Sequence, residues 1–139
     1  MSDSQIKINF ARNKLNFSLT LFVNINIFVV KLSFKTRKLE KQLNDPAMMQ
    51  KKFGQMAKKV NQRMKELRAA DNLEVLMSIP AARCHLLHGD KKDCYAVNIS
   101  GNHRLVFEPD HNPLPRMDDN SVDHLRITDI RILNTEDYH

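Results

Sequence analysis

Apolar residues along the chain follow two different spacings, and the change between them divides the sequence into a helical part and a strand part. Between residues 49 and 67 they recur every three or four positions, at Met49, Phe53, Met56, Val60, Met64 and Leu67. This spacing lines one side of a helix and predicts a single long amphipathic helix. From residue 82 onwards apolar residues alternate with polar ones, and a period of two predicts strands.

Local signals indicate where the helical segments begin. Thr36 is a predicted N-cap for a short helix that precedes the long one. Asn44 or Asp45 is the predicted cap of the long helix. Pro46 suits its first position, where a missing N–H leaves no hydrogen bond unmade. The short apolar run at 72–80 predicts one further helical turn, which its closing proline ends.

Strands are predicted in five places, four of them in the second half of the chain. The β-branched and aromatic composition of residues 27–34 favours a first strand, and the alternating pattern gives four more at 82–89, 94–99, 103–108 and 125–134. Between the third and fourth, "SGN" predicts a tight hairpin in which Gly101 takes positive φ. The stretch 109–124, rich in proline and acidic residues, is a predicted exposed loop. Helices followed by strands indicate an α+β fold, with two N-terminal helices packed on a small, mostly antiparallel sheet.

The length supports one domain, because 139 residues with 42% hydrophobic content can bury one core but hardly two. We expect residues 30–139 to form that domain, and residues 1–29 to be an N-terminal extension outside it or the product of a start assigned too early. The apolar stretch 17–30 is too short to span a bilayer and is interrupted by Asn24 and Asn26. We therefore expect a cytoplasmic protein with no membrane association.

Charge is distributed unevenly. Residues 30–70 contain twelve Lys/Arg and three acidic residues, a net charge of 12 − 3 = +9. Residues 71–139 contain seven Lys/Arg and twelve acidic residues, a net charge of 7 − 12 = −5. The side of the long helix opposite its apolar residues carries Lys51, Lys52, Lys58, Lys59, Arg63 and Lys65. Such a basic surface favours a polyanion as partner. The alternative is a solvated helix face with no ligand.

Neither the cysteines nor the acidic loop predicts a metal or cofactor. Cys84 and Cys94 match no usual zinc spacing, and we expect free thiols in a reducing cytosol. The Asp and His residues of 109–124 are irregularly spaced, so a solvated loop is the favoured interpretation of that stretch.

One combination of motifs is more specific than any single pattern. The segment "RCHLLHGDKKDCYAVNISGNHRLVFEP", with a final "DYH", resembles the HigB-like toxins of the RelE/ParE superfamily, the toxic half of bacterial toxin–antitoxin pairs. The resemblance covers residues 30–139 and implies a RelE-like, microbial-RNase-like fold. For the HigB group it implies a ribosome-dependent mRNA endonuclease that needs no metal, with ribosome and mRNA as partners and a helix-turn-helix, HigA-like antitoxin. Two alternatives remain: a non-enzymatic ParE-like toxin that binds DNA gyrase, and an inactive remnant of the fold.

The resemblance also assigns roles to residues. The catalytic set would be His85, Arg104, Asp137, Tyr138 and His139. The resemblance also places contacts to RNA on the basic strand and turn, through Arg83, Lys91 and Lys92. The charge pattern of the long helix adds the expected RNA contacts Lys51, Lys52, Lys58 and Lys59.

These residue types suit the chemistry. RNA cleavage without a metal requires a base for the ribose 2′-OH, cations for the phosphoryl oxygens and an acid for the leaving 5′-oxygen. Histidine can supply the proton steps because its ordinary pKa lies near neutral pH, and arginine can bind phosphate bidentately. Tyrosine can contact the 2′-oxygen or stack on a base, and Asp137 can orient an imidazole or a base edge.

Structural roles are the alternatives for most of these residues. His85 is otherwise a strand histidine, Arg104 an ion-pair partner of Glu108 or Asp129, Tyr138 a packing residue, and Lys91 and Lys92 solvated turn residues. The other histidines, His88, His103, His111 and His124, are expected at the surface.

Overall fold

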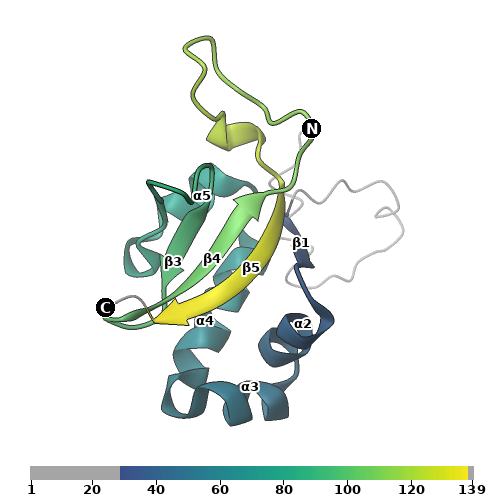
Figure 1. Cartoon of the computed structure of the whole chain (residues 1–139), viewed down its shortest axis with the longest axis vertical. Helices are drawn as coiled ribbons and strands as arrows, with labels where there is room; N and C mark the ends of the chain where they lie inside the picture. Colours follow the sequence, from purple (N-terminus) through teal and green to yellow (C-terminus); the bar gives the residue numbers. More distant parts are fainter. Residues whose placement is uncertain (1–28, 138–139) are drawn as a thin grey trace, which may run out of the picture.

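The computed structural model describes residues 29–137, and β1 (Lys31–Phe34) is its first regular element (Figure 1). The α-helices are α2 (Arg37–Asn44), α3 (Pro46–Phe53), α4 (Ala57–Ala69) and α5 (Leu73–Met77). The remaining strands are β2 (His85–Leu86), β3 (Tyr95–Asn98), β4 (His103–Pro109) and β5 (Asp129–Asp137). Three short 3-10 helices join them: η2 (Gly54–Met56), η3 (Pro80–Ala82) and η4 (His124–Arg126). The predicted extension lies outside the described residues except for Val29, and so does the predicted strand start at Ile27.

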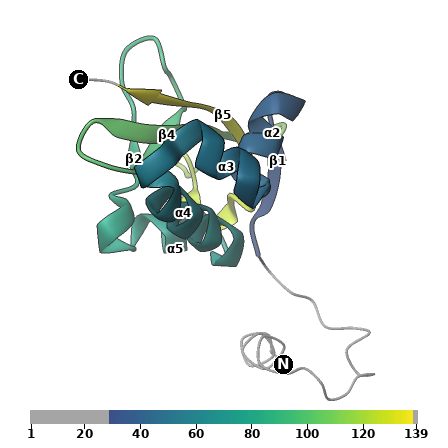
Figure 2. The ribbon, with the colours of Figure 1, turned by 90° about the horizontal axis from the view of Figure 1, so that it is seen from below.

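The five strands form one mixed sheet in the order β1-β5-β4-β3-β2. β1 is parallel to β5, and every other pair is antiparallel. The helices α3 and α4 lie together on one side of β4 and β5, as Figure 2 shows. The predicted α+β class and the mostly antiparallel sheet are therefore confirmed.

The predicted helix starts are confirmed by their caps. The Thr36 hydroxyl accepts a hydrogen bond from the N–H of Leu39 at 3.1 Å. The Asp45 carboxylate accepts one from the N–H of Ala47 at 2.8 Å, and Pro46 occupies the first position of α3. Both caps satisfy N–H groups that have no partner within the helix.

The prediction of one continuous helix through residues 49–67 was wrong. Gly54 ends α3 with φ +54° and ψ −123°, a backbone conformation that side-chain-bearing residues rarely adopt. The 3-10 turn η2 follows, and α4 begins at Ala57. The apolar stripe continues through this break, because Phe53 and Val60 on either side of it are both buried.

The sheet has an apolar cluster on each face. The larger cluster packs between sheet and helices and includes Leu105 of β4 and Ile132 of β5. The smaller one consists of Leu87, Ala96 and Val106. We call the side of Leu105 and Ile132 the helix face and the side of Ala96 and Val106 the open face.

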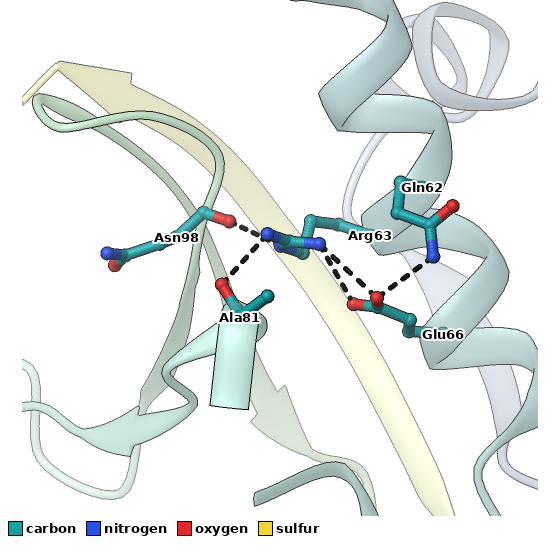
Figure 3. A network of polar contacts seen from close by, with 5 residues as sticks. All are labelled: Gln62, Arg63, Glu66, Ala81 and Asn98. Carbon is teal, nitrogen blue, oxygen red and sulfur yellow. Dashed lines mark hydrogen bonds and ion pairs between the residues drawn. The ribbon is translucent and has the colours of Figure 1, made fainter. Parts of the chain in front are cut away.

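Arg63 was expected on the cationic outer side of the long helix, but it lies against the sheet and its side chain is only 11% exposed. Its Nε donates to the carbonyl of Asn98 at 2.7 Å and its Nη2 to the carbonyl of Ala81 at 2.8 Å. Its Nη1 donates to Glu66 at 3.1 Å (Figure 3). Arg63 therefore joins α4 to β3 and η3 and is not part of an RNA-facing surface.

The β3–β4 hairpin is closed by the N–H groups of Ile99 and Ser100, which both donate to the carbonyl of His103. Gly101 lies in this turn but does not take positive φ, contrary to expectation; Gly89, in the β2–β3 loop, does. The strand predicted at 82–89 is reduced to the two residues of β2. Arg83 just before it is left-handed, with φ +46°.

Residues 110–123 form the expected loop, which projects from the end of β4 (Figure 1). His111 anchors it, because its Nε2 accepts the backbone N–H groups of Thr128 and Asp129 at 3.0 and 3.1 Å. The loop also has a short antiparallel bridge between Arg116 and Val122. No helix within residues 29–137 is long and apolar enough to cross a membrane.

Candidate functional site

Strand register places two of the predicted catalytic residues on the open face. His85 lies opposite Ala96, which lies opposite Val106. Arg104 is two residues before Val106 on β4. It lies opposite Asn98 of β3 on one side and opposite Glu136 of β5 on the other. Residues directly opposite one another share a face, and so do residues two apart on one strand. His85 and Arg104 therefore lie on the same face, in neighbouring rows.

The imidazole of His85 is exposed and has a defined hydrogen bond. Its Nδ1 lies 2.8 Å from the carbonyl oxygen of Arg83. A carbonyl can only accept, so Nδ1 carries the proton, and in the neutral ring Nε2 is the basic nitrogen. The exposed left-handed Arg83 thus orients His85 through its backbone.

Arg104 is paired with an acid that sequence reasoning did not assign to the site. Its Nε and Nη2 both donate to Oε2 of Glu136, at 3.2 and 3.0 Å. Lys91, from the β2–β3 loop, places its Nζ 3.8 Å from Oε1 of the same carboxylate. The structural alternative for Arg104, an ion pair with Glu108 or Asp129, named the wrong acid, because Glu108 pairs with Arg131.

A β-bulge decides which residues at the end of β5 accompany Arg104. Val106 lies opposite Asn134 and Phe107 opposite Ile132, so Leu133 is an extra residue on β5. Side chains of a strand alternate between the two faces of the sheet, and one extra residue exchanges the faces of all the residues after it. Glu136 consequently lies on the open face.

Asp137 lies on the helix face, opposite His103. Their Oδ2 and Nε2 atoms are 3.5 Å apart, and Nδ1 of His103 is 3.1 Å from the hydroxyl of Ser100. His103, expected as a simple surface residue, is thus the imidazole beside Asp137. The structure does not bring Asp137 onto the face of His85 and Arg104. Tyr138 and His139 lie outside the described residues.

A hollow of about 240 Å³ separates the end of β5 from α3, and Lys52, His103 and Asp137 are among its lining residues. Among the predicted RNA-binding lysines of the helices, Lys52 is therefore the one beside the C-terminal end of β5. The others on the helices, Lys51, Lys58 and Lys59, are exposed on α3 and α4, and Lys92 is exposed in the β2–β3 loop.

A second hollow, of about 500 Å³, lies between β2, β3 and the 110–123 loop. Tyr95 and His124 line it, and the Tyr95 hydroxyl lies 2.9 Å from Nε2 of His124. His124 is half-buried, contrary to expectation. Burial, the largest cause, together with the charge of Asp93, raises the pKa of Tyr95 to about 12, so this phenol stays protonated at neutral pH.

The cysteines are free thiols, as expected. Burial raises the pKa of Cys84 to about 12. It packs in the larger cluster, whereas Cys94 packs against the smaller one, so the sheet separates them. In the described part of the chain, no three His, Cys, Asp or Glu residues are grouped to hold a metal ion.

Comparison with known proteins identifies the family. The model of the RelE-like toxin of type II toxin–antitoxin system HigB matches residues 32–123. This chain therefore belongs to the HigB-like toxin family. The matched region contains His85 and Arg104 and ends before β5.

Three solved toxin structures match the chain at low sequence identity. The YoeB/ParE toxin from Agrobacterium tumefaciens is 14% identical, with a TM-score of 0.43, over 79% of this chain and 100% of that chain. The YoeB dimer from Staphylococcus aureus is 23% identical, with a TM-score of 0.43, over 79% of this chain and 97% of that chain. The YoeB–YefM complex from Staphylococcus aureus is 20% identical, with a TM-score of 0.40 and the same coverage. No protein with a curated description matches this chain significantly.

Proposed function

We propose that this chain is a ribosome-dependent mRNA endonuclease that inhibits translation as the toxin of its toxin–antitoxin pair. Membership of the HigB-like family supports the toxin role. One structural observation supports the enzymatic role: the exposed imidazole of His85 on β2 shares a sheet face with the guanidinium of Arg104 on β4, in neighbouring rows and with β3 between the two strands. This pairing offers a proton-transfer group and a phosphate-binding group on one surface.

In the proposed reaction, His85 exchanges a proton through Nε2, because Nδ1 already donates to the Arg83 carbonyl. Arg104, with Lys91 beside it, stabilises negative charge on the phosphoryl oxygens. Tyr138 and His139 would complete the proton transfers, and Asp137 would orient an imidazole, which in this fold is that of His103 at 3.5 Å.

RNA would be held largely by phosphate contacts, which supply affinity without reading sequence. The cations proposed for this are exposed: Lys51, Lys52, Lys58, Lys59, Arg83 and Lys92. Because the proposed substrate is ribosome-bound mRNA, the proposed location of the protein is the cytoplasm. The proposed partner that neutralises it is a helix-turn-helix antitoxin of the HigA type.

The test is cleavage of mRNA on purified translating ribosomes by the purified full chain, with transcript ends mapped by primer extension. We expect new ends with the wild-type protein and almost none with His85→Ala, while His88→Ala, which changes an exposed histidine in the β2–β3 loop, retains activity. Intact transcripts together with inhibited gyrase supercoiling would support the gyrase-binding alternative and overturn the proposal.

A further inference from the structure

We propose that Glu136 is a positioning residue of the site: it holds Arg104 and Lys91 together on the open face so that both cations meet the same RNA phosphate. The inference rests on the proposed function and assigns to Glu136 a role that the resemblance does not contain. It follows from the contacts of one carboxylate with cations from two separate elements.

The contact with Arg104 is fixed by the backbone. Glu136 and Arg104 are directly opposite in the β4–β5 register, and their side chains are only 20% and 15% exposed. Oε2 accepts from both Nε and Nη2, so the guanidinium is held by one edge in a single orientation. Both partners are on paired strands, and little conformational freedom is lost in keeping this geometry.

The contact with Lys91 joins a loop to that strand pair. Lys91 lies in the loop of residues 87–94, its side chain is 40% exposed, and its Nζ is 3.8 Å from Oε1 of Glu136. An ammonium and a guanidinium repel each other, and an anion between them offsets that repulsion. Glu136 is such an anion, because its carboxylate contacts both cations.

The opposing possibility is that the carboxylate competes with RNA by occupying the phosphate site of Arg104. The two roles predict opposite effects of removing its charge. If Glu136 positions the cations, its loss misplaces them and slows cleavage; if it competes, its loss speeds cleavage.

The chain provides a matched control. Arg131 donates through Nε and Nη2 to Oε2 of Glu108 at 3.0 and 2.8 Å, between the same two strands and in direct register. Glu136→Gln and Glu108→Gln therefore neutralise cross-strand pairs of the same hydrogen-bond geometry, although Arg131 and Glu108 are more exposed, at 43% and 33%. The contact with Lys91 is made by Glu136.

The experiment measures kcat and KM for ribosome-bound mRNA, and Tm, for the full-length wild type and both variants. We expect Glu136→Gln to lower kcat by up to about 100-fold, the size of effect that misplacing a reacting group by roughly 1 Å can reach. KM should change little, because distant lysines supply most of the binding. Glu108→Gln should leave kcat within about threefold of the wild-type value, because the loss of one partly exposed ion pair has a small effect.

A second measurement tests whether Glu136 acts through Lys91. In a Lys91→Ala background, Glu136→Gln should cost clearly less than in the wild type, because part of its effect acts through Lys91. Equal effects of the two Gln variants, full additivity with Lys91→Ala, or faster cleavage by Glu136→Gln would each overturn the inference alone. A wild-type protein that leaves mRNA intact on ribosomes would overturn the proposed function and this inference together.

Discussion

Glu136 and Asp137 are consecutive residues of β5, yet Glu136 lies opposite Arg104 on the open face and Asp137 lies opposite His103 on the helix face. Consecutive strand residues point to opposite faces, so these two acids have different roles. The first pairs with cations that could bind phosphate, and the second pairs with an imidazole.

Arg63 should be a large contributor to stability. Arg63→Met keeps much of the apolar stem but leaves the carbonyls of Asn98 and Ala81 without these donors and removes the cation beside Glu66. We expect the free energy of unfolding to fall by about 3 kcal/mol, measured by urea denaturation. Lys59→Met, at an exposed position of the same helix, should change it by less than about 0.5 kcal/mol. Equal effects would show that the Arg63 network contributes little.

Gly54 should be intolerant of any side chain. An added Cβ would meet nothing within 4 Å, so the cost of Gly54→Ala comes from its φ of +54° alone. We expect a loss of about 1–3 kcal/mol in unfolding free energy. Gly101→Ala is the matched control, because it has equal space and no positive φ; it should be nearly neutral. A neutral Gly54→Ala would mean that the helix does not need this break.

Stability should decline in alkaline solution because two buried acids resist ionisation. Burial raises the pKa of Cys84 from 9.0 to about 12 and that of Tyr95 from 10.0 to about 12. A raised pKa contributes stability that is complete below the unfolded value and is lost as pH rises towards the folded value. Urea denaturation should therefore show a loss that begins near pH 9, where the unfolded thiol starts to ionise.

Cys84→Ala should make the alkaline loss of unfolding free energy shallower. The part of the loss that comes from ionisation of Tyr95 should remain. The decisive quantity is the slope of unfolding free energy against pH, because the substitution also removes packing. An unchanged slope would show that the Cys84 thiol does not resist ionisation in the folded protein.

Deletion of residues 1–25 should leave the domain intact. The described core begins at Val30, which is buried and donates its N–H to the carbonyl of Ala70 at 2.8 Å. We expect the unfolding free energy of the truncated protein to lie within about 0.5 kcal/mol of that of the full chain, and its rate of mRNA cleavage to be unchanged. A large loss of stability would reveal that the deleted segment contributes a structural element.

Features that depend on neighbouring residues could be predicted from sequence, whereas those that depend on distant partners could not. The caps at Thr36 and Asp45 bond N–H groups two or three residues away, so their signals are local. Arg63 sits in a run of exposed lysines, and its carbonyl partners are 18 and 35 residues away. No periodicity distinguishes it from its neighbours.

The end of β5 shows the same limit in the candidate site. Alternation from Ile130 and Ile132 alone would put Glu136 on the helix face and Asp137 on the open face. The bulge at Leu133 reverses this, and only the pairing with β4 reveals it. The family resemblance pointed to His85 and Arg104 as candidate site residues, whereas the acid beside Arg104 could be found only from the strand register.

The most direct test of the proposed activity is the single-turnover rate of mRNA cleavage on ribosomes by the wild-type chain and by His139→Ala. Loss of one positioned proton-transfer group should lower the rate by roughly two to four powers of ten. Ribosome binding, measured in parallel, should barely change because phosphate contacts by the lysines dominate it. Cleavage by His139→Ala at the wild-type rate would contradict the catalytic role proposed for the end of the chain.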